Sequence, residues 1–148
     1  MNRILIIGIG NEFHGDDAAG LIAARRLRGL VSSDVRIIEH TGDGQALLDL
    51  WADAEGAILL DAVRSGAPPG TIIEIDANHE SVPHQYFGHS THAFGLTQAI
   101  EMGKVLHCLP SRLQFYGIEA QSFEYGVGLS APVEAAVTSL TQKLSNQY

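Results

Sequence analysis

The feature that most constrains the fold is a set of short, nearly continuous runs of apolar and β-branched residues. Three of them occur early in the chain, at residues 3–8, 35–39 and 57–60. Runs of this length without polar alternation are typical of strands that are buried on both faces of a parallel sheet. Two later runs, at residues 71–75 and 113–118, are also expected to be strands. The pattern therefore predicts a sheet with a covering layer on each side.

The segments between these runs carry apolar residues at a spacing of three to four, which predicts helices. Helices are expected from Asp16-Asp17 towards Leu30, at about 44–52, at about 93–107, and from Ser130 onward. Strands that alternate with helices predict an α/β fold, a three-layer αβα sandwich with a mainly parallel sheet. The length of 148 residues suits a single domain over residues 1–148.

Composition restricts the partners and the compartment. Nine basic and seventeen acidic residues give a net charge of −8, which argues against nucleic acid or an anionic membrane as a partner. No apolar run approaches the roughly 20 residues of a membrane span, and the start of the chain does not resemble a signal peptide. The single cysteine, Cys108, has no cysteine partner for a disulfide. A cytoplasmic location is expected.

The loop after the first run resembles a dinucleotide-binding turn only in part. Gly8 and Gly10 are in place, but Phe13 occupies the position of the third glycine. Without that glycine the following helix is not expected to approach the sheet in the usual way. Asp16 and Asp17 would also repel a pyrophosphate. Nucleotide binding by an α/β domain is therefore a minor alternative.

Acidic and imidazole side chains follow several of these elements. One of Asp16 and Asp17 is expected to cap the helix, which leaves the other carboxylate free. Asp61 follows the third run, where it either binds backbone N–H groups or faces a ligand cleft. His92 precedes a predicted helix, and His89 lies three residues before it in a long polar loop over residues 76–90. If Asp17, Asp61 and a histidine converge, they form an oxygen–nitrogen site suited to nickel or zinc.

Other readings of the chemistry have less support. The chain has no Gly-x-Ser-x-Gly elbow and no His-Glu-x-x-His helix, and Cys108 is interpreted as structural. Phe123, Tyr125 and the glycines around them form either a partner-binding loop or a plain surface turn.

Taken in order, the motifs resemble the hydrogenase maturation protease family. The resemblance rests on these segments: Gly8-Ile9-Gly10-Asn11, Gly15-Asp16-Asp17 with Gly20, Leu60-Asp61-Ala62, His92-x-x-Gly95-Leu96, Tyr116-Gly117-Ile118-Glu119 and Gly128-Leu129-Ser130-Ala131-Pro132-Val133-Glu134. It extends from Ile4 to about Leu140. Each motif is modest by itself, but their order and spacing together are fairly specific.

This resemblance implies a fold, an activity and a set of site residues. The fold is a five-stranded twisted sheet between helices. The activity is endopeptidase removal of a C-terminal extension from the precursor large subunit of a [NiFe] hydrogenase. The implied metal ligands are Asp17, Asp61 and His92, whereas Asp16 serves structure. Asp17 or Asp61 would act as general base, or the metal would activate water or polarise the scissile carbonyl.

The resemblance also implies that nickel is carried by the substrate and used for recognition, and that other divalent cations can replace it in the site. The protein is expected to be monomeric. One departure concerns the loop from Glu39 to Gly44, where the family often has an acidic residue, two glycines and a threonine. His40 stands in this loop, and the departure leaves the hydrogenase subclass open. The alternative function is a non-catalytic nickel-sensing or chaperone-like module for a hydrogenase subunit.

Overall fold

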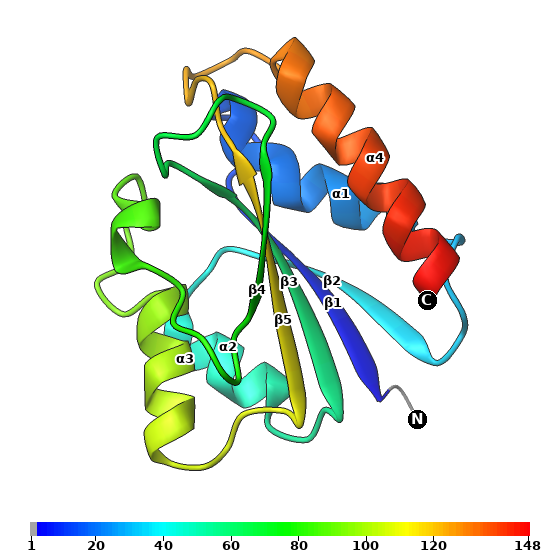
Figure 1. Cartoon of the computed structure of the whole chain (residues 1–148), viewed down its shortest axis with the longest axis vertical. Helices are drawn as coiled ribbons and strands as arrows, with labels where there is room; N and C mark the ends of the chain where they lie inside the picture. Colours follow the sequence, from blue (N-terminus) through cyan, green and yellow to red (C-terminus); the bar gives the residue numbers. More distant parts are fainter. Residues whose placement is uncertain (1–2) are drawn as a thin grey trace.

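A five-stranded sheet forms the centre of the molecule (Figure 1), in a computed structural model that describes residues 3–148. The strands are β1 (Ile4–Ile9), β2 (Val35–His40), β3 (Gly56–Val63), β4 (Ile72–Asp76) and β5 (Arg112–Glu119). All five predicted runs are therefore strands. Every residue of β3 is buried, as the unbroken apolar run predicts for a central strand.

The strand order is β2-β1-β3-β5-β4. The first four of these strands pair in parallel, and only β4 runs antiparallel to its neighbour β5. The expectation of a mainly parallel five-stranded sheet is confirmed. The edge strand β4 reverses because residues 64–71, which connect it to β3, are too few for the parallel crossover, which needs about a dozen or more residues.

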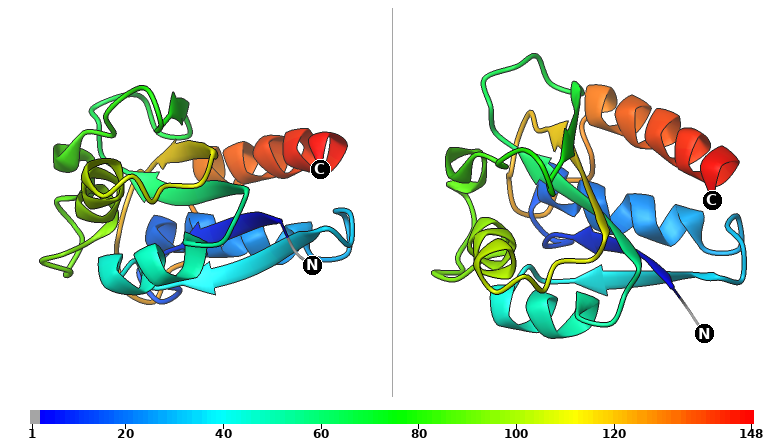
Figure 2. Two further views of the ribbon diagram at one scale, coloured as in Figure 1. Left: turned by 90° about the horizontal axis from the view of Figure 1, so that it is seen from below. Right: turned by 60° about the horizontal axis from the view of Figure 1, so that its bottom comes forward.

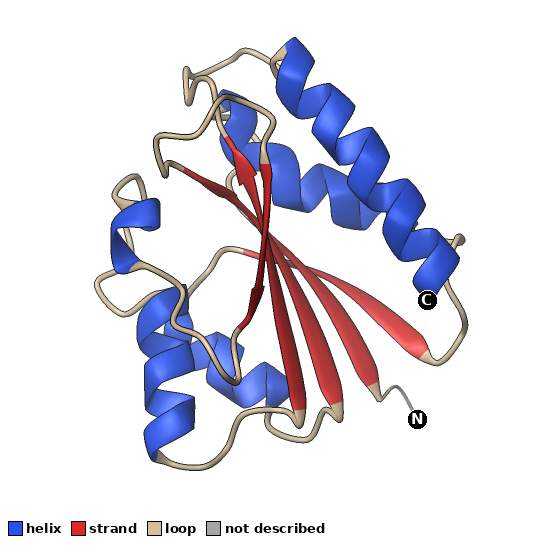
Figure 3. Ribbon diagram, viewed as in Figure 1, coloured by secondary structure: helices blue, strands red, loops and turns tan. Residues whose placement is uncertain are grey.

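Helices cover both faces of the sheet (Figures 2 and 3). On one face α1 (Ala19–Leu27) packs beside α4 (Ala131–Gln147), over a core that contains Ile6, Leu60 and Ile118. On the other face α2 (Gly44–Trp51) packs beside α3 (Leu96–Val105), over a core that contains Trp51, Leu59 and Phe115. The three-layer αβα sandwich is therefore observed. Within residues 3–148, no helix is at once long and apolar enough to span a bilayer.

Three element boundaries differ from the sequence prediction. A short 3-10 helix, η1 (Gly15–Ala18), precedes α1, and neither aspartate in it caps a helix in the expected way. The first helix ends at Leu27, which leaves Leu30 exposed. The third helix begins at Leu96, because the Gln98 side chain accepts the backbone N–H of Gly95 at 2.9 Å and closes its first turn. His92 therefore lies in a loop and not at a helix start.

The helix after the first strand lies closer to the sheet than Phe13 led us to expect. Gly8 on β1 faces Gly20 on α1, and a Cβ atom on Gly8 would overlap the Gly20 carbonyl. A Cβ atom on Gly20 would in turn overlap the Leu60 carbonyl of β3. The close approach therefore uses Gly20, five residues beyond Gly15, and it needs no glycine at position 13.

The order of the strands determines where a cleft opens. The chain leaves β1 through α1 to β2 on one side, and then crosses back through α2 to β3 on the other. The helix that follows β1 and the helix that precedes β3 therefore lie on opposite faces of the sheet. In open α/β sheets, ligands bind at the carboxyl ends of the strands at such a switch point. Asp17 follows the end of β1, and Asp61 lies near the end of β3.

Candidate metal centre

A pocket of about 950 Å³ lies at the carboxyl edge of the sheet. Its lining includes Asp17 and Asp61, together with residues of the long loop between β4 and α3. Five of the seven histidines of the chain contribute to it: His14, His40, His84, His89 and His92. The pocket therefore concentrates nitrogen and oxygen donors at the switch point.

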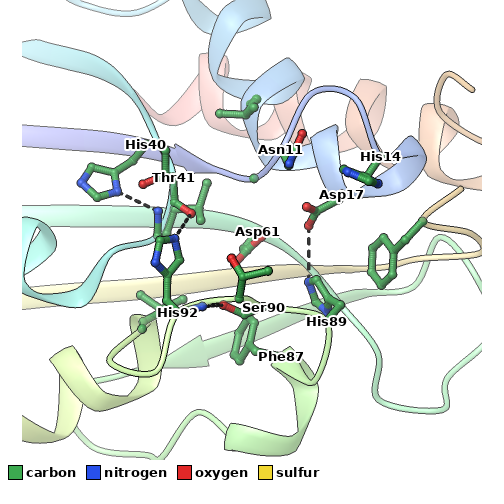
Figure 4. A pocket seen from close by; sticks show the side chains of 18 of the residues that line it. Asn11, His14, Asp17, His40, Thr41, Asp61, Phe87, His89, Ser90 and His92 are labelled. Carbon is green, nitrogen blue, oxygen red and sulfur yellow. Dashed lines mark hydrogen bonds and ion pairs between the residues drawn. The ribbon is translucent and has the colours of Figure 1, made fainter. Parts of the chain in front are cut away.

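Two carboxylates and one imidazole converge in this pocket (Figure 4). Asp17, Asp61 and His89 each offer a ligand atom, and these atoms all lie within 4.8 Å of one another. The carboxyl end of β3 fixes Asp61, whereas η1 carries Asp17 and the loop before α3 carries His89. We call these three residues the carboxylate cluster. Their atoms are close enough to share one divalent cation.

His89 is oriented by contacts on two sides. Its Nε2 lies 3.4 Å from Asp17 Oδ1, and its ring stacks on Phe123 with 4.2 Å between the ring centroids. The guanidinium of Arg64 lies 4.6 Å from the centre of the same Phe123 ring. Among residues 3–148, His89 Nδ1 is buried without a hydrogen-bond partner. The imidazole is thus held by its face and by Nε2, with no hydrogen bond at Nδ1.

Asp61 is the buried acid of the carboxylate cluster. Burial, together with the negative charge of Asp17, raises the pKa of Asp61 well above its ordinary value, while a hydrogen bond from the Ala62 N–H opposes the shift. That N–H donates to Asp61 Oδ1 at 2.8 Å. An acid held in this way favours its protonated form until a positive charge comes close. A cation between Asp17 and Asp61 would supply that charge.

Asp16 points away from the pocket and holds a distant loop. Its carboxylate accepts the backbone N–H groups of Gln121, Ser122 and Ser130, and also the Ser130 hydroxyl. Four donors satisfy the charge of a side chain that is 1% exposed. Asp16 therefore joins η1 to the segment between β5 and α4. This agrees with the structural role that the family resemblance implies for it.

His92 lies elsewhere on the pocket wall. Its Nε2 is 3.2 Å from the carbonyl oxygen of Thr41, and it faces the side of the pocket where His40 lies (Figure 4). His40 accepts the Gly42 N–H at Nδ1, and burial lowers its pKa, with Asp43 opposing the shift and His92 adding to it. We call His40 and His92 the histidine pair. No acidic group completes a three-ligand set around it within residues 3–148.

The structure brings two of the three predicted ligands together and places the third apart from them. Asp17 and Asp61 come together as expected, but the imidazole beside them belongs to His89 and not to His92. Both histidines lie on one loop, three residues apart, and the stacking of His89 on Phe123 selects the residue that faces the carboxylates. That spacing was visible in the sequence. The contact with Phe123 was not, because it joins segments far apart in the chain.

The donor set suits a borderline divalent cation. Two carboxylate oxygens and one imidazole nitrogen match the preferences of zinc and nickel. Three protein ligands leave coordination positions open for water or a substrate group, as in catalytic metal sites. Fold and site together thus define an αβα-sandwich protein with a candidate catalytic cation centre at the switch point of its sheet.

Known proteins with similar sequences carry names that refer to hydrogenase formation or maturation. The family model of the hydrogenase maturation proteases matches residues 23–147, which include Asp61 and both loop histidines. The hydrogenase 2 maturation protease of Escherichia coli K12 is 30% identical over 139 residues, which cover 91% of this chain and 84% of that protein. The hydrogenase expression/formation protein HupD of Rhodobacter capsulatus is 28% identical over 91% of this chain. The match spans only 66% of that HupD protein's own length.

Solved structures agree with the sequence comparison. The hydrogenase maturating endopeptidase HybD from E. coli has a TM-score of 0.77 and 25% identity, over 96% of this chain and 89% of that one. The [NiFe] hydrogenase maturation protease HycI from Thermococcus kodakarensis KOD1 has a TM-score of 0.74 and 25% identity, over 98% and 91%. The chain belongs to the hydrogenase maturation protease family, a family of peptidases.

Proposed function

We propose that the protein is an endopeptidase that removes a C-terminal extension from the nickel-loaded precursor of a [NiFe] hydrogenase large subunit. The observation that carries the proposal is the carboxylate cluster, which lies in a pocket large enough for an extended peptide in a member of a peptidase family. The protein acts as a monomer in the cytoplasm. Nickel arrives with the substrate. The protein uses it to distinguish a nickel-loaded precursor from a nickel-free one.

The chain's own residues perform three tasks in this proposal. Asp17 and His89 present an oxygen and a nitrogen at the wall of the pocket, and they take positions on the incoming cation. Asp61, ionised once the cation is near, accepts a proton from the water that attacks the scissile carbonyl, and returns it to the amine nitrogen as the C–N bond breaks. The buried end of β3 keeps Asp61 in place and limits its access to solvent.

Recognition of nickel follows from the electrostatics of the pocket. Without a cation, burial and the charge of Asp17 favour protonated Asp61, which cannot act as a base. A precursor that carries nickel would lower the pKa of Asp61 again, whereas a nickel-free precursor would not. The metal would then be required for cleavage, because it supplies the positive charge that favours ionised Asp61.

The direct test is to incubate the purified protein with nickel-loaded and nickel-free precursor and to measure the large subunit by intact mass spectrometry. We expect a shortened large subunit only with the nickel-loaded form. Binding of the loaded precursor without any loss of mass would instead support a non-catalytic nickel-sensing module. Equal cleavage of both forms would contradict the proposed role of nickel in recognition.

A further inference from the structure

We propose that an exposed apolar surface beside the pocket docks the body of the precursor, next to the segment that is cut. This surface consists of Phe13, Tyr125 and Val127, and we call it the rim patch. The inference rests on the proposed function, and it adds the place at which the protein partner is held. The complementary surface of the partner is apolar.

The rim patch is assembled from two loops that hold each other in place. The N–H of Gly126 donates to the Phe13 carbonyl at 2.9 Å, and the ring of His14 meets the ring of Tyr125 edge-on at 5.4 Å. Val127 lies over Gly15, where a Cβ atom would be 3.3 Å from its Cγ2. The buried Asp16 carboxylate, next to the first loop, also accepts hydrogen bonds from the second loop. These contacts hold the two loops, and with them the side chains of the rim patch, in fixed positions relative to one another.

The side chains of the rim patch are unusually exposed for their type. Phe13 is 59% exposed, Tyr125 is 72% exposed and Val127 is 43% exposed. Single exposed apolar residues are ordinary, but a contiguous group at the edge of a concave site marks an interaction surface. Aromatic residues also contribute most to protein–protein contacts when a partner covers them.

The rim patch is continuous with the proposed substrate pocket. Phe13 and His14 line the pocket themselves, and Phe123, from the same loop as Tyr125, stacks on His89 inside it. A polypeptide with its scissile bond at the carboxylate cluster can therefore pass from the pocket directly onto the patch. This continuity identifies the occupant as the substrate protein.

A second exposed apolar group provides a matched control. Met102, Val105 and Leu106 lie at the carboxyl end of α3 and are 40%, 74% and 61% exposed. That end of α3 points away from the loop between β5 and α4 (Figure 1). The two groups are similar in exposure and apolar character. Only the rim patch borders the pocket, so only the rim patch is expected to affect processing.

The test compares the double variant Phe13→Ser/Tyr125→Ser with the control Val105→Ser/Leu106→Ser in the processing of nickel-loaded full-length precursor. We expect the KM of the rim-patch variant to rise by roughly ten-fold or more, as for truncated interface anchors, with kcat nearly unchanged. The control should match the wild type. Zinc affinity, measured by calorimetry, should be the same in all three proteins, because neither pair touches the carboxylate cluster.

Each outcome leads to a definite conclusion. If the wild-type protein processes the precursor and the rim-patch variant does so with an unchanged KM, the docking role is wrong and the proposed function stands. If both variants raise KM equally, the effect is not specific to the rim patch and the docking role is again wrong. If the wild-type protein leaves the nickel-loaded precursor uncut, the proposed function fails and the docking role fails with it.

Discussion

The carboxylate cluster and the histidine pair lie in one pocket but differ in what surrounds their donor atoms. In the carboxylate cluster a buried acid lies beside a second acid and an imidazole, and the imidazole stacks on an aromatic ring. In the histidine pair, His92 has the Thr41 carbonyl as its partner, and His40 accepts a backbone N–H. Donor type alone therefore does not make a metal site. The first group differs from the second in having two carboxylates whose oxygens lie within 4.8 Å of the imidazole nitrogen.

The largest expected effect comes from Asp61. Asp61→Asn should reduce processing of nickel-loaded precursor by about 100-fold or more, the usual contribution of a general base. Measuring kcat with the full-length precursor tests this.

Asp17→Asn should also lose activity and remain folded. Asp16→Asn is the matched control for the neighbouring carboxylate, because it should lower the melting temperature by disturbing four hydrogen bonds. Near wild-type kcat for Asp61→Asn would remove this residue from the chemistry.

The next effect separates the two histidines directly. His89→Ala should weaken zinc or nickel binding by at least about ten-fold, since even outer-shell partners contribute that much. His92→Ala should change it by less than about two-fold, because its imidazole lies beside Thr41 in the histidine pair. Titration calorimetry of the two purified variants makes the comparison. The reverse ranking would show that the loop exchanges His89 for His92 when a cation binds, and the choice of His89 as ligand would then be wrong.

A smaller effect is expected from the ring behind His89. Phe123→Leu should weaken cation binding by about two- to ten-fold, which corresponds to the roughly 0.5–1.5 kcal/mol of an aromatic pair. Arg64→Gln removes the cation that lies over the Phe123 ring but keeps the ring, so it should have less effect. Calorimetry at one pH measures both variants. Equal affinities for wild type and Phe123→Leu would mean that stacking does not orient His89.

The smallest effect concerns stability without any cation. The pKa of Asp61 is higher in the folded protein than in the unfolded chain, so the free energy of unfolding falls as pH rises from about 4 towards that raised pKa. Asp61→Asn removes this loss. In EDTA the variant should therefore melt at a higher temperature than wild type at neutral pH, with the difference shrinking as pH falls to about 4. A difference that is independent of pH would contradict the assignment of a raised pKa to Asp61.

Much of the fold could be predicted because it depends on local patterns. The apolar runs give the strands, but the strand order is not a local property, because β5 lies between β3 and β4, which are consecutive in the chain. Asp61 was also accessible to prediction, since a carboxylate at the end of a buried strand must face a cleft or a partner. The direction of β4 follows from the short segment 64–71, although the run itself contains no sign of direction.

The choice between His89 and His92 could not be predicted from local pattern. It depends on Phe123, which lies more than thirty residues away in sequence and meets His89 only in the folded chain. The closeness of α1 to the sheet was misjudged for a similar reason. The glycine that permits it, Gly20, faces Gly8 across two elements and does not follow the spacing of a nucleotide-binding turn.

The four hydrogen bonds of Asp16 have a consequence for how docking and catalysis relate. The buried Asp16 side chain joins η1, which carries Asp17, to the loop that carries Phe123 and Tyr125. The loop at the outer rim therefore keeps a fixed position relative to the acids, and Phe123 of the same loop stacks on His89. Loss of the rim-patch side chains would thus remove contact area for the partner, while this hydrogen-bonded frame keeps the reacting groups in place.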